Sequence, residues 1–217
     1  MKKEDILKSL KELKEKSEKR NFKQTVDLII SLKNLNLKKP EDQVDFFQSL
    51  HFATGKKKKV CALVGPELIG QAKEVCDQAI SVDEFDKLSK DKKAVKKIAR
   101  ECDYFIAQAN IMAKVAAAFG KILGPKGKMP NPKAGCVVPP NANLKVLYER
   151  LQKLVKLSAK TMPMIQCNVG KEDSKNEEVA DNVFTIYDSL IHHLPGGKNN
   201  IKHVLLKLTM SKPIKLM

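Results

Sequence analysis

The short apolar run from residue 60 to residue 64 is the feature of this sequence that most constrains its fold. The run reads Val-Cys-Ala-Leu-Val, and it follows a glycine and four lysines at residues 55–59. A strand that is apolar on both faces is typical of a parallel sheet covered by helices on both sides. Helical and strand patterns alternate in the segment that follows, as they do in β-α-β units. We therefore predict an inserted three-layer α/β domain over residues 60–152.

The two ends of the chain have a different pattern. Every second residue is apolar in residues 25–32 and again in residues 204–208, which predicts half-buried strands. Apolar residues at helical spacing in residues 6–13 and 179–190 predict amphipathic helices. The predicted fold class is α+β with two domains: a discontinuous antiparallel α/β sandwich formed by residues 1–59 and 153–217, and an inserted Rossmann-like domain formed by residues 60–152.

The same patterns predict the individual elements. In the inserted domain we expect helices at 67–78, 92–101, 111–119 and from 143 onward, with strands at 104–107 and 136–138. The lysine-rich helical stretch 86–100 is interrupted at Asp91. In the outer domain we expect strands 25–32 and 44–50 to be antiparallel neighbours joined by a turn at Pro40. Residues 155–158 and 164–169 are expected to form a hairpin, and Ser174 with Glu177 to begin a helix as a capping box.

The charge of the chain predicts an anionic partner. Lysine and arginine number 41 against 25 aspartate and glutamate, which gives a formal net charge of +16. Three stretches are basic without any acidic residue, at 51–66, 120–143 and 198–217. The sequence has no apolar run of the ~18 residues that a membrane span requires, so we expect no membrane partner. These features favour nucleic acid as the partner, whereas the lysines of the helix at 86–100 are expected only to keep the domain soluble.

The cysteine and aromatic content further limits the class of protein and its mode of binding nucleic acid. Five cysteines at wide spacing do not form a disulfide framework or a metal knuckle, so we expect a cytoplasmic protein without a structural metal. The chain contains eight Phe, three Tyr and no Trp, so base stacking cannot be the main mode of binding. A structured RNA can instead be bound through phosphates and 2′-hydroxyl groups.

Residues 124–132 carry a glycine- and lysine-rich string that does not satisfy a phosphate-loop motif. A Walker A loop requires glycine where Ile122 stands and a hydroxyl where Met129 stands. We interpret the segment as a stiff surface loop whose secondary RNA contacts would be made by Lys126, Lys128 and Lys133.

The sequence contains no recognisable catalytic constellation. His192 and His193 are adjacent on a predicted helix and diverge by about 100°, so they cannot share one metal ion. We expect no enzyme activity, no cofactor and no metal. The alternative left open is that the inserted domain is a nucleotide- or small-molecule-binding α/β enzyme domain.

Four motifs in order resemble the universal large-subunit ribosomal protein L-one family, in its archaeal and eukaryotic branch. They are Ile122-Leu-Gly-Pro-Lys-Gly-Lys-Met-Pro130, Arg20-Asn-Phe-Lys-Gln-Thr-Val-Asp27, Ile165-Gln-Cys-Asn-Val-Gly-Lys171 and Thr209-Met-Ser-Lys-Pro213. The resemblance spans nearly the whole chain. It implies a ribosome-associated protein, monomeric when free, that binds large-subunit rRNA at the mobile stalk near the tRNA exit site. It also implies contact with exit-site tRNA, a part in tRNA release, and translational repression through the protein's own mRNA.

The resemblance also implies which residues contact RNA, all of them in the outer domain. They are Phe22, Gln24, Thr25, Lys160, Gly170, Lys171, Thr209, Met210 and Ser211. The threonines can bind ribose hydroxyls, Lys171 supplies charge for a phosphate, and Gly170 is expected to allow close approach of the backbone. Ser211 stands where the family usually has glycine, which is expected either to reduce affinity or to add a hydroxyl contact.

Overall fold

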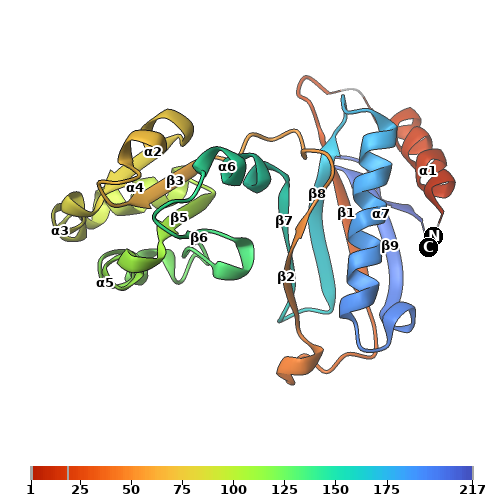
Figure 1. The fold of residues 1–217 in the computed structure, drawn as a ribbon. Coiled ribbons are helices and arrows are strands. Elements are labelled where there is room, and N and C mark those ends of the chain that lie inside the picture. Colours follow the sequence, from red (N-terminus) through yellow and green to blue (C-terminus); the bar gives the residue numbers. More distant parts are fainter. Residues whose placement is uncertain (1, 19, 217) are drawn as a thin grey trace. The chain divides into compact units, whose positions relative to one another are not determined.

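The computed structural model describes residues 2–18 and 20–216 of the chain. These residues form two compact units (Figure 1). Unit 1 is made of Met1–Lys56 and Lys153–Met217, and unit 2 is made of Lys57–Gln152. Helices and sheets are combined in both, so the α+β class expected from the sequence is confirmed.

Unit 1 combines two long helices with an antiparallel sheet. The helices are α1 (Lys3–Lys16) and α7 (Asn176–His193). The strands are β1 (Thr25–Leu32), β2 (Val44–Ser49), β7 (Leu154–Ala159), β8 (Met164–Lys171), β9 (Ile201–Leu208) and β10 (Ile214–Lys215). Four of them form a sheet in the order β10-β9-β1-β8, and β2 and β7 form a separate antiparallel pair.

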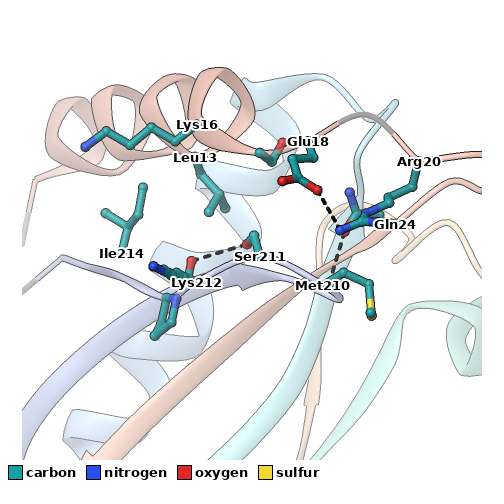
Figure 2. A pocket seen from close by; sticks show the side chains of 11 residues that line it. Leu13, Lys16, Glu18, Arg20, Gln24, Met210, Ser211, Lys212 and Ile214 are labelled. Carbon is teal, nitrogen blue, oxygen red and sulfur yellow. Dashed lines mark hydrogen bonds and ion pairs between the residues drawn. The ribbon is translucent and has the colours of Figure 1, made fainter.

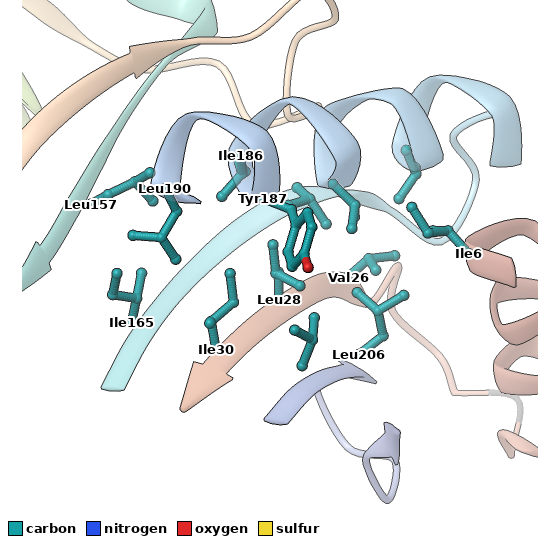
Figure 3. Close-up of a cluster of buried hydrophobic side chains, with 14 of the residues drawn as sticks. Ile6, Val26, Leu28, Ile30, Leu157, Ile165, Ile186, Tyr187, Leu190 and Leu206 are labelled. Atoms are coloured by element: carbon teal, nitrogen blue, oxygen red, sulfur yellow. The ribbon is translucent and has the colours of Figure 1, made fainter. Parts of the chain in front are cut away.

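One hydrophobic core holds unit 1 together. Val26, Leu28 and Ile30 occupy alternate positions of β1 and are fully buried. Figure 3 shows these side chains facing Ile186 and Leu190 of helix α7. Full burial of one such side chain stabilises the folded state by about 1.5–3 kcal/mol. The predicted alternation is confirmed, and it leaves the opposite face of β1 only half-buried.

The strand neighbours in unit 1 differ from those expected. β1 is bounded by β8 and β9, which both come after unit 2 in the chain, and β2 pairs with β7. The prediction that residues 25–32 and 44–50 are neighbours is therefore wrong. Residues 155–158 and 164–169 also fail to form a hairpin, because they belong to different sheets. Local turn signals cannot identify a partner strand that follows an inserted unit.

The start of helix α7 also differs from the prediction. The helix begins at Asn176 after Lys175, and no side chain caps it. The hydroxyl of Ser174 instead accepts a hydrogen bond from the Lys171 backbone N–H at 3.2 Å. The expected capping box is absent because this serine closes the turn that follows β8.

Unit 2 is built around a parallel sheet in the order β4-β3-β5-β6. Its strands are β3 (Val60–Val64), β4 (Gln78–Ser81), β5 (Tyr104–Gln108) and β6 (Val137–Val138). Its helices are α2 (Ile69–Val75), α3 (Phe85–Lys90), α4 (Lys92–Glu101), α5 (Met112–Leu123) and α6 (Leu144–Lys153). All five residues of β3 are buried, as the apolar run predicts, and the side chains of Cys61 and Leu63 pack under α3, α4 and α5.

Two elements of unit 2 depart from the sequence prediction. The helix expected over residues 67–78 ends at Val75, and Gln78–Ser81 form β4, which was not predicted. Asp91 does not merely interrupt a helix. Its carboxylate accepts hydrogen bonds from the backbone N–H groups of Lys93 (2.9 Å) and Ala94 (3.1 Å), so it caps the start of α4.

The chain enters and leaves unit 2 through two segments that are bonded to each other. The Lys58 backbone N–H donates to the side-chain oxygen of Gln152 at 2.8 Å, and the Gln152 side-chain amide donates to the Lys58 carbonyl at 2.8 Å. One glutamine therefore fixes both segments at the edge of unit 2.

Candidate nucleic-acid interface

One end of the four-stranded sheet brings three of the expected RNA-contact residues together. Thr25 begins β1 and lies opposite Lys171, the last residue of β8. Thr209 follows the end of β9, where Leu208 lies opposite Val26. The Thr209 hydroxyl accepts a hydrogen bond from the Thr25 backbone N–H at 3.1 Å and lies 2.9 Å from the Thr25 hydroxyl oxygen. Antiparallel pairing thus places residues from three distant segments on one surface.

Two exposed apolar side chains belong to segments at this same end of the sheet. Phe22, three residues before Thr25, is 52% exposed, and Met210, next to Thr209, is 62% exposed. We call the set formed by Phe22, Thr25, Lys171, Thr209 and Met210 the strand-end face.

Gln24, one of the expected contact residues, is buried and holds a turn in place. Its side chain is only 1% exposed, and its amide oxygen accepts a hydrogen bond from the Met210 backbone N–H at 3.1 Å. Its backbone carbonyl accepts from the Glu172 N–H at 2.9 Å. Gln24 therefore holds the Met210 turn against the end of β8, and its side chain is not exposed at the surface.

Gly170 is also directed inward. A Cβ atom at this position would lie 2.7 Å from the Val179 Cγ2 atom of helix α7. The residue is buried and lies opposite Val26. The structure therefore explains this glycine by close packing of α7 on β8, whereas the sequence analysis assigned it to close approach of RNA.

Ser211 completes the turn after β9. Its hydroxyl oxygen accepts a hydrogen bond from the Leu208 backbone N–H at 2.8 Å, and its own N–H donates to the Leu208 carbonyl at 3.1 Å. Among the described residues other than glycine, only Asn34 has a positive φ angle. The turn therefore does not require glycine here, and the serine hydroxyl stabilises the turn that presents Thr209 and Met210.

A groove of about 500 Å³ adjoins the strand-end face between the end of α1 and the turn after β9 (Figure 2). The groove is lined by Leu13, Lys16, Ser17, Glu18, Arg20, Gln24, Met210, Ser211, Lys212, Pro213 and Ile214. Its rim has three cations and one carboxylate, and Arg20 is paired with Glu18 at 2.7 Å. None of these cations was among the expected contact residues. Arg20 and Lys212 nevertheless belong to two of the motifs that carry the resemblance, and Lys212 also lies in an acid-free stretch.

Some of the described lysines of this surface are neutralised by ion pairs, whereas others are not. The Lys23 ammonium lies 2.6 Å from the Asp173 carboxylate, and this hydrogen bond lowers the pKa of Asp173. In the described part of the chain, no carboxylate lies within 4.0 Å of the ammonium group of Lys171 or Lys212. These two lysines therefore keep their charge available for an anion.

Lys160 lies away from the strand-end face. It is in the connection between β7 and β8, and its ammonium pairs with Asp45 at 2.6 Å. β8 runs from Met164, opposite Ser31, to Lys171, opposite Thr25. At ~3.3 Å per residue, the strand separates its two ends by roughly 23 Å. The structure therefore does not bring Lys160 together with the other expected contact residues.

The lysine-rich loop of unit 2 follows the C-terminal end of helix α5. Gly127 has a φ angle of 64° and its N–H donates to the Gly124 carbonyl, while the Lys128 N–H donates to the Leu123 carbonyl. Phosphate loops use the N-terminus of a helix, where N–H groups are free. This loop has the opposite polarity, so it does not form a nucleotide site of that kind. Lys133 lies beyond it, in the short turn Pro132–Ala134.

Comparisons with known proteins agree with the resemblance seen in the sequence. The model of the Ribosomal protein L1p/L10e family matches residues 13–212. The large ribosomal subunit protein uL1 of Methanobrevibacter smithii is 40% identical, covering 98% of this chain and 99% of the relative. The uL1 proteins of Methanothermococcus thermolithotrophicus (40%, with 100% and 99% covered) and Hyperthermus butylicus (37%, with 98% and 96% covered) are also similar.

The described residues include no helix that is both long and apolar enough to cross a membrane.

The family model and the relatives cover nearly the whole chain, and the expected resemblance is confirmed. The chain therefore belongs to the Ribosomal protein L1p/L10e family, a family of structural and non-enzymatic proteins.

Proposed function

We propose that this protein binds rRNA within the large ribosomal subunit and that the strand-end face of unit 1 is its main RNA-contact surface. Membership of the family gives it a structural role in the large subunit. The observation that supports the surface is the convergence of Thr25, Lys171 and Thr209 at one end of the sheet. The net charge of +16 supports a polyanionic ligand.

The chemistry of the face suits a folded RNA. Each threonine hydroxyl has one proton and two lone pairs, so the Thr25–Thr209 pair retains capacity for a ribose 2′-hydroxyl. Lys171 supplies an unpaired charge for a phosphate. Phe22 and Met210 offer apolar surface to a sugar or a base. This combination requires few aromatic groups, in keeping with the composition of the chain.

Substitutions on the strand-end face are expected to weaken binding without unfolding the protein. Lys171→Ala should reduce affinity for a folded rRNA fragment about fivefold at 0.15 M salt and flatten the salt dependence of log affinity by ~0.7–0.9. Thr209→Val should cost about five- to tenfold, since one hydrogen bond contributes ~1–1.5 kcal/mol. Gel-shift titration across a salt series measures both effects, and circular dichroism checks the fold.

Two variants serve as controls for this experiment. Thr209→Ser keeps the hydroxyl and should retain most of the affinity. Lys202→Ala removes the same charge as Lys171→Ala, but from the other end of β9, near Ile201 and Leu32, and should have little effect. Equal losses in Lys171→Ala and Lys202→Ala would mean that only total charge matters, and that the strand-end face is not the contact surface.

Three finer roles are part of the same proposal. The loop that carries Lys126, Lys128 and Lys133 makes secondary RNA contacts. The protein contacts exit-site tRNA from the mobile stalk and assists its release. It also represses its own translation by binding its mRNA through the strand-end face. A reporter fused to the native leader tests the last role: expression should fall when protein is supplied and recover with Thr209→Val, and insensitivity to both would contradict it.

A further inference from the structure

Helix α4 exposes an unusual concentration of positive charge. Val95 and Ala99 are buried against the core of unit 2. Five of its ten residues are exposed cations, and its one acidic residue is Glu101; the cations are Lys92, Lys93, Lys96, Lys97 and Arg100. Lys96 and Arg100 are four residues apart and therefore lie on the same side of the helix, one turn after the other.

A hydrogen bond attaches the lysine-rich loop to the end of this helix. The Lys128 ammonium donates to the carbonyl of Cys102, the residue that terminates α4, at 2.6 Å. The loop follows helix α5, which packs against α4 (Figure 1). The contact brings the loop to the C-terminal turn of α4, which carries Arg100. A lysine at this position also interacts favourably with the helix dipole.

The charges of α4 and of the loop act on one another. Loss of hydration lowers the pKa of Lys126, and the positive charges of Arg100, Lys128 and Lys96 lower it further. Lys126 is nevertheless exposed. The loop lysines and the α4 cations therefore form one mutually repelling cluster, which we call the α4–loop cluster: Lys96, Arg100, Lys126 and Lys128.

Nearby carboxylates are engaged elsewhere. Glu101 accepts a hydrogen bond from the Gln78 side chain at 3.3 Å, and Asp103 accepts from the Lys59 backbone N–H at 3.3 Å. Asp91 caps the opposite end of α4. Among the residues that the structure describes, no carboxylate lies within 4.0 Å of the charged group of Lys96, Arg100 or Lys126. The repulsion is not relieved inside the protein.

We propose that the α4–loop cluster is a second RNA-binding surface, located on unit 2, which binds adjacent phosphates of an RNA backbone. The guanidinium of Arg100 can form paired hydrogen bonds with one phosphate, and Lys96 and Lys126 supply point charges beside it. Lys128 keeps two further ammonium protons after its bond to Cys102. Helix α4, whose lysines were expected only to keep the domain soluble, thus contributes half of the site.

The surface fits RNA better than it fits an anionic membrane. A helix that lies on a membrane buries large apolar side chains in the lipid boundary. The exposed large apolar residues of the described chain are Phe22, Phe52, Val146, Met162 and Met210. None of them belongs to α4 or to the loop. The inference rests on the proposed function in one respect, since it takes RNA as the polyanion that the protein meets.

A pair of double variants of the full-length protein tests the proposal. Lys96→Gln with Arg100→Gln removes two charges from the cluster. Lys73→Gln with Lys145→Gln removes two exposed charges from helices α2 and α6 of the same unit, neither of which contributes to the core beneath α4. The probe is deproteinised large-subunit rRNA, with binding measured at several salt concentrations. We expect the first variant to lose about tenfold or more in affinity at 0.15 M salt and to flatten the salt slope by ~1.4–1.8. The second should change affinity less than about twofold.

Equal losses in the two double variants, or no loss in either, would overturn the proposal. Binding to vesicles of phosphatidylserine and phosphatidylcholine is measured in parallel. A loss confined to the vesicles would replace RNA by a membrane as the ligand. Failure of the strand-end face is recognised separately: Lys171→Ala and Thr209→Val would then bind rRNA normally, while the cluster variant would still be impaired and the inference would stand.

Discussion

Alanine in place of Gly170 is expected to lower the free energy of unfolding of unit 1 by about 1–3 kcal/mol. The added Cβ atom would lie 2.7 Å from the Val179 Cγ2 atom, closer than van der Waals contact allows. Helix α7 or strand β8 must move, and both contribute to the core. Urea unfolding followed by circular dichroism measures the loss, and hydrogen exchange with mass spectrometry should place it in unit 1.

A double-mutant cycle identifies the cause of this loss. Val179→Ala removes the atom that would clash, so Gly170→Ala should cost less in that background, and the two substitutions should not be additive. Gly120 provides the control. It lies within helix α5, with nothing within 4 Å of its Cβ position, so Gly120→Ala should stabilise the protein by about 0.5–1 kcal/mol. Additive effects in the cycle would show that packing against Val179 is not the reason for glycine.

Replacement of Lys58 by methionine is expected to stabilise unit 2 by about 1–3 kcal/mol at pH 7. Burial lowers the pKa of Lys58 from 10.5 to about 8, although the charge of Asp103 opposes the shift. The folded protein therefore carries a disfavoured charge at neutral pH. Methionine keeps the apolar stem of the side chain. It loses interactions of the ammonium group, among them the hydrogen bond of 3.4 Å to the Leu151 carbonyl and the contact with the Tyr104 ring, whose centroid is 5.6 Å away.

The sign of the pH dependence distinguishes this cause from others. Between pH 8 and pH 10.5 the unfolded chain holds the Lys58 proton while the folded chain has released it, so the stability of the native protein rises with pH. The advantage of Lys58→Met should thus shrink over that interval in urea titrations at each pH. Lys57 is a matched control, because it is exposed and the charge of Asp77 raises its pKa. Stabilisation by Lys57→Met, or a constant advantage of Lys58→Met, would contradict the explanation.

Much of the fold could be predicted because the spacing of apolar residues along the chain indicates which side chains are buried in each helix or strand. The apolar run at 60–64 lies in a buried parallel strand, and the alternating residues of β1 face the core. Strand pairing could not be predicted, because the partners of β1 lie beyond unit 2 and depend on global packing. β4 was missed for another reason: the preceding helix was predicted to reach Gln78, whereas it ends at Val75, and residues 79–81 were assigned to no element.

The residues of the candidate site could be named from the sequence, but their arrangement in the structure was harder to predict. Thr25, Lys171 and Thr209 converge as the resemblance implies, but Gln24 and Gly170 face inward and Lys160 lies at the far end of β8. Sequence motifs do not separate residues that contact a ligand from those that hold the contacting residues in place. The loop of the α4–loop cluster lies in a motif, but helix α4 does not, and the two meet only through the Lys128 hydrogen bond and helix packing.

The order of strands in unit 1 has a consequence for biosynthesis. β1 leaves the translating ribosome early, yet both of its hydrogen-bonding neighbours are made after unit 2 is complete. At 5–20 residues per second, the nascent strand remains without partners for on the order of 10 s. All strands of unit 2 are available before then, so this unit can fold first. Until then, the unpaired backbone N–H and C=O groups of β1 can form hydrogen bonds with strands of other chains. We therefore expect this topology to require that the nascent chain be protected from such pairing.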